Sequence, residues 1–295
     1  MADTLLLVDA YSMIYRAFFA IRHLTGPNAE PVNAIFGVTK MLRKLIAERR
    51  PTHVAVVFDL GAPRKRLAVL PSYKEHRPPT PPDLEAQLPA IRSILESLRL
   101  PVVEVDGEEA DDIIGTLAVR AAAAGFTVWI STNDKDFTQL INDRIRLLRP
   151  GEKADVVFDS AAVHAKYGLR PEQMVDFFTL TGDSIDNVPG IPGIGEKTAT
   201  GLLQQFGTLD DLLGRTAEIT RPKLRATLAE AGPHARQNRE LVKLVTDLPL
   251  PVDLPALAAR APDYPALIAK LRSHGFKSLT AEVEREANTP ADLFG

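Results

Sequence analysis

Short, largely apolar runs that alternate with helical patterns constrain the fold of this chain most. The runs lie at residues 5–8, 53–58, 102–105 and 127–131. Helical patterns follow them, at residues 11–20, 35–49, 84–98 and from 113 to about 124. Uninterrupted apolar runs of this length are typical of parallel strands buried on both faces. Residues 5–150 are therefore predicted to form an α/β fold, with a mainly parallel central sheet and helices on both faces.

Carboxylates follow three of these runs. Asp9 and Asp59 come directly after the first two, and Asp134 and Asp136 come shortly after the fourth. Open α/β sheets bind ligands at the carboxyl ends of their strands. Asp9 alone could simply cap the next helix. Because a second strand also ends in Asp, a shared functional role at the sheet edge is favoured over coincidence. Arg16, about two turns into the first helix, could reach the same edge.

The densest acidic stretch contains four carboxylates within five positions: Glu108, Glu109, Asp111 and Asp112. It opens a helical pattern, and the helix dipole would explain one or two acids there. Glu109 and Asp112 share a helix face, however, and Asp111 and Asp112 are adjacent, so their charges repel. This crowding predicts a compensating hard cation such as Mg²⁺, which takes oxygen ligands.

The length and composition of the chain exclude several classes of protein and site. The chain of 295 residues can hold two domains, and it has no cysteine, which excludes disulfides and thiolate metal sites. The N-terminus lacks the basic region of a signal peptide, and no window approaches a transmembrane span. We expect a cytoplasmic protein that associates with the nucleoid.

The net charge of −3 is unusual for a nucleic-acid-binding protein. If nine of the 38 acids form one site, 29 acids remain against 35 Lys and Arg, an excess of six positive charges. The nine candidate metal ligands are Asp9, Asp59, Glu109, Asp111, Asp112, Asp134, Asp136, Asp183 and Asp186. A basic surface around an acidic metal pocket suits a phosphodiester substrate.

The segment from about 60 to 82 lacks periodicity and is basic. Its cations are Arg64, Lys65, Arg66, Lys74 and Arg77. Loops this long are usually functional or disordered. Beside an acidic pocket, such a loop could grip phosphates, and Tyr73 could stack on a base. The alternative is a solvated linker.

The second half of the chain is a helical pattern to about residue 286. After a predicted helix at 171–181 come Asp183 and Asp186, and a Gly-rich hairpin at 188–199 then joins two helices. Its backbone N–H groups could bind an anion, or it could be a tight turn that binds nothing. A P-loop is excluded because Glu196 separates Gly195 from Lys197.

Several spaced motifs resemble the bacterial 5′ nuclease family, the flap endonucleases that include the 5′→3′ exonuclease domain of DNA polymerase I. The resemblance covers residues 4–285 and departs at Leu60, Lys65 and Ile185. The motifs are Val8-Asp9, Val57-Phe58-Asp59, Tyr73-Lys74 with Arg77-Pro78, Glu109-Ala110-Asp111-Asp112, Asp134-Lys135-Asp136, and Gly182-Asp183 through Gly195-Glu196-Lys197-Thr198-Ala199. Since no polymerase domain follows, we expect a stand-alone nuclease or a truncated chain.

The resemblance implies a domain organisation. A PIN-like catalytic α/β domain would cover 1–168, with a basic mobile arch at about 60–82. A helix-hairpin-helix-type DNA-binding domain would cover 169–287, with its Gly-rich hairpin at 188–199, and a flexible tail would cover 288–295.

The resemblance also implies roles for the site residues. Asp9, Asp59, Glu109, Asp111 and Asp112 would hold a first Mg²⁺, and the other four acids would hold or support a second; Mn²⁺ could substitute. Lys74 and Arg77 would stabilise charge on the scissile phosphate, with Arg16 as a further catalytic cation, and Tyr73 would stack on the terminal base. The remaining DNA contacts would come from Arg64, Lys65, Arg66, Gly190, Gly193, Gly195, Lys197 and Thr198. In the family the hairpin also binds K⁺ through backbone carbonyls.

The expected function is a structure-specific 5′ nuclease with 5′→3′ exonuclease and 5′-flap endonuclease activity. It would remove flaps and RNA primers in replication and repair by a two-metal-ion mechanism, on DNA with a flap, nick or overhang or on RNA-primed 5′ ends. The alternatives are a related metal-dependent ribonuclease and a non-catalytic DNA-binding module. A phosphatase with an Asp-x-Asp nucleophile is excluded because the first strand ends Asp9-Ala10-Tyr11.

The C-terminal segment Pro290–Gly295 resembles the short motif that binds the bacterial sliding clamp, with Pro290 where Gln is expected. An exposed Leu293-Phe294 pair on a flexible tether would suit a partner's pocket. Alternatively, the pair folds back onto the core.

Overall fold

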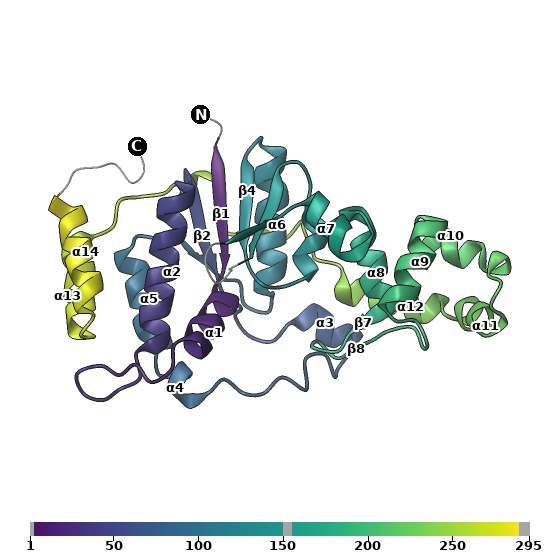
Figure 1. Cartoon of the computed structure of the whole chain (residues 1–295), viewed down its shortest axis with the longest axis horizontal. Helices are drawn as coiled ribbons and strands as arrows, with labels where there is room; N and C mark the ends of the chain where they lie inside the picture. Colours follow the sequence, from purple (N-terminus) through teal and green to yellow (C-terminus); the bar gives the residue numbers. More distant parts are fainter. Residues whose placement is uncertain (1–2, 150–154, 289–295) are drawn as a thin grey trace.

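A six-stranded sheet lies at the centre of the computed structural model, which describes residues 3–149 and 155–288 (Figure 1). The strand order is β3 (Val102–Val103), β2 (His53–Val57), β1 (Thr4–Asp9), β4 (Thr127–Ser131), β5 (Ile145–Arg149) and β6 (Val156–Phe158). The first five are parallel and β6 is antiparallel. The prediction of a mainly parallel sheet with helices on both faces is confirmed, although β5 and β6 were not predicted.

Helices cover both faces of the sheet, which is why the central strands are mainly apolar along their length. Leu5 and Leu7 of β1 pack toward α6 (Ala110–Ala123), and Leu6 and Val8 pack toward α1 (Ala10–Ala20) and α2 (Asn33–Arg49). All four leucine and valine side chains are fully buried. The carboxyl ends of the parallel strands therefore meet at one edge of a rigid core.

The segment at 60–82 contains regular structure that the sequence did not reveal. Helix α3 (Arg64–Val69) packs against α12 (Gly232–Val242), and the Gln237 side chain donates to the Val69 carbonyl at 3.0 Å. Beyond this segment, the single helix predicted at 84–98 is divided into α4 (Pro82–Glu85) and α5 (Leu88–Ser97).

The helical region extends from the sheet at one end of the molecule (Figure 1). It contains α7 (Ser160–Tyr167), α8 (Met174–Thr181), α9 (Glu196–Phe206), α10 (Leu209–Gly214), α11 (Pro222–Glu230) and α12. Two short antiparallel strands, β7 (Gly182–Asp183) and β8 (Val188–Pro189), follow α8. Elsewhere in the described part of the chain, 3₁₀ turns occur at η1 (Asp136–Leu140), η2 (Pro171–Gln173), η3 (Thr216–Glu218) and η4 (Pro255–Leu257).

The last two helices lie at the opposite end of the molecule (Figure 1). Leu267 and Leu271 of α13 (Tyr264–Ser273) and Val283 of α14 (Lys277–Asn288) share a buried core with α2 and α5. Arg43 of α2 also pairs with Glu282 at 3.3 Å. The helical domain was expected to cover 169–287. Helices α13 and α14, at the end of this range, instead pack with α2 and α5 on one face of the sheet.

The predicted clamp-binding segment and residues 289–295 of the predicted tail lie outside the described residues. Within the described part of the chain, no helix is long and apolar enough to cross a membrane.

Candidate active site

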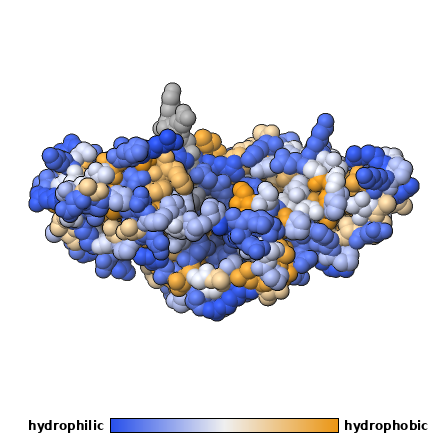
Figure 2. Space-filling model, turned by 90° about the horizontal axis from the view of Figure 1, so that it is seen from below, coloured by the Kyte–Doolittle hydropathy of each residue, from blue (hydrophilic) through white to orange (hydrophobic). Residues whose placement is uncertain are grey.

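A cavity of about 510 Å³ opens at the carboxyl edge of the sheet. Figure 2 views the molecule from this edge and shows a recess near the centre with hydrophilic residues around it. The cavity is lined by six of the nine predicted ligands: Asp9, Asp59, Asp111, Asp134, Asp183 and Asp186. Acids that are far apart in the sequence are thus brought together by the topology.

The first group of acids is fixed by hydrogen bonds at the strand ends. Asp9 accepts from the Ser12 amide at 3.0 Å, which caps α1, and from the Thr132 hydroxyl at 2.8 Å. Asp59 accepts from the Ala110 amide at 2.8 Å, which ties the end of β2 to the start of α6. The capping role of Asp9 and a position in the site are therefore compatible.

The negative charges of these acids repel one another. Burial, together with the nearby charges of Asp134 and Asp59, raises the pKa of Asp9 to about 6. Burial and the charges of Asp134 and Asp9 raise the pKa of Asp111 well above its usual range, and burial also raises the pKa of Asp134. Uncompensated negative charge of this density favours a bound cation.

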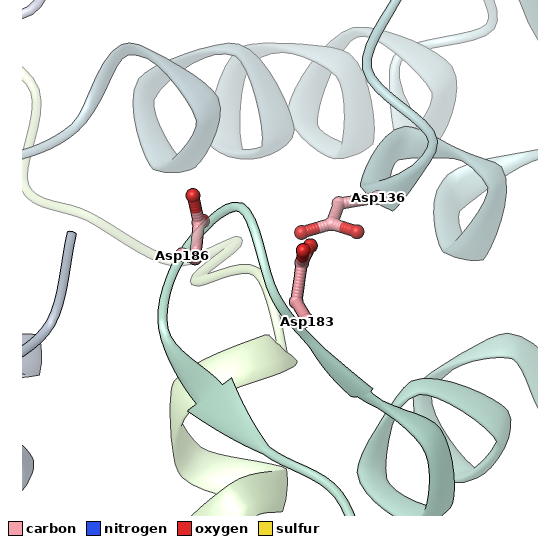
Figure 3. Close-up of side chains that lie close together, drawn as sticks. All are labelled: Asp136, Asp183 and Asp186. Atoms are coloured by element: carbon pink, nitrogen blue, oxygen red, sulfur yellow. The ribbon is translucent and has the colours of Figure 1, made fainter. Parts of the chain in front are cut away.

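The second group consists of Asp136, Asp183 and Asp186 (Figure 3). One carboxylate oxygen from each lies within 4.8 Å of the others. Oδ1 of Asp136 is buried and has no hydrogen-bond partner in the part of the chain that the structure describes. A buried acceptor without a donor is costly, so this oxygen set fits a hard divalent cation, which takes oxygen ligands at short range.

Two predicted cations reach the cavity from the segment after α3. Lys74 pairs with Glu109 and lies 3.7 Å from Asp186, and Arg77 pairs with Asp186 at 2.6 Å. Although burial raises the pKa of Asp186, the charges of Lys74 and Arg77 lower it below its usual value. In this conformation, Lys74 and Arg77 therefore neutralise part of the negative charge that a metal ion would otherwise neutralise.

Tyr73 was predicted to stack on a base, but only 6% of it is exposed. Its hydroxyl donates to Asp186 at 3.0 Å. Tyr73 therefore supports the acidic cluster in this conformation and presents no ring face for stacking.

Arg66 is placed differently from the prediction of a DNA contact. It is 6% exposed, and its guanidinium contacts both oxygens of Asp112, Oε2 of Glu109 at 2.5 Å and the Leu241 carbonyl at 3.0 Å. Asp112 also accepts from the Val245 amide at 2.8 Å. Glu109 and Asp112 do not line the cavity, because their carboxylates are held by this buried arginine.

The remaining predicted residues lie outside the cavity. Arg64 and Lys65 are exposed and pair with Asp106 and Glu108. Arg16 is half-buried on α1 and does not line the cavity.

The predicted hairpin residues have two different environments. A Cβ on Gly190 would lie 2.3 Å from the Thr181 carbonyl oxygen, so this glycine permits close packing. Gly193 and Gly195 face open space, Lys197 is exposed, and the Thr198 amide donates to the Gly195 carbonyl. Gly195 caps α9 without a side-chain hydrogen bond, which leaves N–H groups at this helix end for an anion.

Other residues that line the cavity were missed by the sequence analysis. They are Tyr11, Ser12, Tyr15, Asn133, Lys135, Arg149, Lys166 and Ile185. Lys135 stands between two predicted acids and pairs with Asp183, so its position could have been inferred. Arg149 was missed because β5 was not recognised as a strand.

Two family models match the chain. The model described as the 5′-3′ exonuclease N-terminal resolvase-like domain matches residues 4–168, and the model of the 5′-3′ exonuclease C-terminal SAM fold matches residues 169–265. The chain is similar to the 5′-3′ exonuclease of Aquifex aeolicus, with 37% identity over 96% of both chains. This chain is also 40% identical to DNA polymerase I of Bacillus caldotenax. The match covers 96% of this chain but only 33% of the length of that relative.

The fold is similar to that of the bacteriophage T5 flap endonuclease, solved with DNA and metal ions. The TM-score is 0.70 at 19% identity, over 97% of this chain and all of the other. At this identity the likeness establishes the fold alone.

Proposed function

Because the chain belongs to the 5′-3′ exonuclease family, we propose that it is a structure-specific 5′ nuclease that hydrolyses phosphodiester bonds near the 5′ ends of DNA. Its substrates would be DNA with a 5′ flap, nick or overhang, and RNA-primed 5′ ends, as arise in replication and repair. The observation that carries the proposal is one cavity lined by six carboxylates and by Lys74 and Arg77. Carboxylates alone would repel a phosphodiester, whereas carboxylates with divalent ions and two cations can bind one and hydrolyse it.

We assign the acids to two metal positions. Asp9, Asp59, Asp111 and Asp134 would hold one Mg²⁺, and Asp136, Asp183 and Asp186 would hold the other; Mn²⁺ could replace either. Asp134, which the resemblance assigns to the second ion, is moved to the first because its charge acts on Asp9 and Asp111. Two such ions can activate a water and stabilise the leaving oxygen of an in-line displacement. The chain itself fixes the carboxylates: Thr132 and the Ser12 amide orient Asp9, and the Asp136 amide orients Asp134 at 2.8 Å.

The cations around the acids divide into contacting and positioning groups. Lys74 and Arg77 line the cavity and would leave Asp186 to stabilise charge that develops on the scissile phosphate. Arg66 of α3 would act as a positioning residue, because it pairs with Glu109 and Asp112 at the start of α6 and so orients Asp111 between them. This role replaces the DNA contact proposed for Arg66 and the direct metal ligation proposed for Glu109 and Asp112.

Cleavage of a labelled 5′-flap duplex with Mg²⁺ and with EDTA tests the function. We expect products from Mg²⁺ reactions only, with cuts mapped at or next to the flap junction. A second substrate with an RNA 5′ segment tests primer removal, and a single-stranded RNA of the same sequence tests the ribonuclease alternative. Tight flap binding without cleavage under any metal condition would instead indicate a DNA-binding module.

The hairpin at Gly190–Gly195 is proposed to bind duplex phosphates at the start of α9, with backbone carbonyls as K⁺ ligands. Gly195→Leu should weaken duplex affinity by roughly tenfold, since a side chain there would block phosphate from the free N–H groups. Gly201→Leu is the matched control, because this glycine lies within α9, away from its N-terminus, and also faces open space. Fluorescence anisotropy with a duplex measures both. Equal affinities for the two folded variants would make the hairpin structural only.

We also propose that the C-terminal Pro290–Gly295 segment binds the sliding clamp. Deletion of residues 288–295 should remove a weak interaction, with a dissociation constant of about a micromolar or more, and leave flap cleavage by the isolated enzyme unchanged. A labelled peptide of these residues titrated with purified clamp provides the measurement. The absence of saturable binding, or equal clamp binding by the deletion variant, would end this proposal.

A further inference from the structure

We infer that Arg149 and Lys166 form a second cationic wall of the cavity, which binds a backbone phosphate adjacent to the one that is cleaved. The inference rests on the proposed nuclease function and extends it to residues outside the predicted motifs. Both side chains line the cavity, Arg149 from the end of β5 and Lys166 from the last turn of α7. They therefore come from different elements than Lys74 and Arg77.

The register of the sheet fixes where Arg149 lies. Val8 is opposite Ser131 and Ser131 is opposite Leu148, so the next row contains Asp9, Thr132 and Arg149. Neighbouring strands lie about 4.8 Å apart, which places the Arg149 backbone roughly 10 Å from that of Asp9. Leu7 and Leu147, two residues earlier on each strand, share one core, so Asp9 and Arg149 face the same side of the sheet. A substrate strand that crosses this edge would meet carboxylates first and then a cation.

Two donors of the Arg149 guanidinium lack a partner among the described residues. Its Nε and Nη2 are buried and make no hydrogen bond within residues 3–149 and 155–288. The group lies 3.9 Å from the centre of the Phe158 ring, which restricts its orientation. Buried donors without acceptors are costly, and the planar fork of arginine matches two oxygens of a phosphate. An anionic ligand would satisfy both nitrogens.

The other cations of the cavity differ in this respect. Lys74, Arg77 and Lys135 each pair with an acid of the site. Among the described residues, neither Arg149 nor Lys166 takes part in an ion pair of this kind, and Lys166 is exposed near the ring of Tyr167. Two cations that the carboxylates leave unneutralised are suited to hold substrate charge.

The first test is the salt dependence of flap binding in EDTA. Arg149→Gln and Lys166→Ala should each weaken binding by about tenfold and lower the slope of log affinity against log salt by about one. Arg146→Gln is the matched control, since Arg146 lies on the same strand but stacks near Trp129 and does not line the cavity. Circular dichroism melting checks the fold, and the exposed Lys166 provides a variant that does not depend on packing against Phe158.

The second test places a neutral methylphosphonate at each phosphate within two nucleotides of the flap junction. For the wild type, one position next to the scissile phosphate should weaken binding by about tenfold, and the same change should cost the Arg149→Gln protein nothing further. The inference would be overturned if the methylphosphonate penalties were equal in the wild type and both variants at every position. It would also be overturned if both variants kept the affinity and salt dependence of the Arg146→Gln control. Both tests measure binding, so absence of flap cleavage by the wild type would count against the proposed function only.

Discussion

Asp111→Asn enzyme is expected to retain less than about a thousandth of the wild-type single-turnover rate on a 5′ flap, because metal ions contribute several kcal/mol to such reactions. Asp111 is half-buried, lines the cavity and lies close enough to Asp134, Asp9 and Asp59 for their charges to raise its pKa. Asparagine keeps the shape and removes the charge that would hold the metal. Asp134→Asn should behave alike, and both should bind flap DNA within a few-fold of the wild type.

The same substitution should make the metal-free protein more stable near neutral pH. The pKa of Asp9 is raised from 3.8 to about 6, and that of Asp111 is also raised well above its usual range. Above about pH 4 the unfolded chain releases these protons while the folded chain keeps them, so the free energy of unfolding falls as pH rises from about 4 to about 6. Asp111→Asn removes one of the mutually repelling groups and should flatten this decline.

Thermal denaturation in EDTA across this pH range measures the effect, and the same series in Mg²⁺ should stabilise the wild type more than the variant. Asp143→Asn is the control, because Asp143 is exposed and lies outside the cavity. An Asp111→Asn protein with most of the wild-type turnover would contradict the assignment. Equal melting temperatures of variant and wild type in EDTA would contradict the charge argument alone.

The position of the site could be predicted because it follows from a general rule of parallel sheets. Residues 5–8 and 54–58, which directly precede Asp9 and Asp59, are apolar throughout, and they place both acids at one edge whatever the details of packing. The run at β5 is interrupted by Arg146, which is half-buried and lies 5.6 Å from the centre of the Trp129 ring. That interruption concealed the strand and, with it, the position of Arg149.

The sequence could not distinguish Asp111 from Asp112. Adjacent residues on a helix point about 100° apart, so one faces the cavity and the other faces the interior. Which one does so depends on Arg66, a partner 46 residues away that binds Asp112 bidentately. Likewise, the pattern of α14 indicates a buried face, but its partners on α2 are more than 200 residues earlier in the chain. Such choices are made by tertiary contacts and leave no local signal.

Lys74→Met is expected to lower the single-turnover rate on a 5′ flap by about a hundredfold, comparable to the loss of one donor to a transition state. Methionine preserves the aliphatic part of the side chain and removes the ammonium. Although burial lowers the pKa of Lys74, the charges of Glu109 and Asp186 raise it above its usual value, so the group is charged at neutral pH. Lys44→Met on α2 is the control, since Lys44 pairs with Glu48 away from the cavity.

The substitution should also loosen the base of the arch in the free protein. The Lys74 amide donates to the Asp186 carbonyl at 3.0 Å, and the Asn187 side chain donates to the Ser72 carbonyl at 2.8 Å. Loss of the ion pairs with Glu109 and Asp186 should therefore speed amide hydrogen exchange at residues 72–77, while the Lys44 variant stays like the wild type. Flap DNA should protect residues 64–82 of the wild type, because the arch would then grip the substrate. A normal rate for Lys74→Met would show that Lys74 serves only to neutralise Glu109 and Asp186, and unchanged exchange on DNA would show that the arch does not grip.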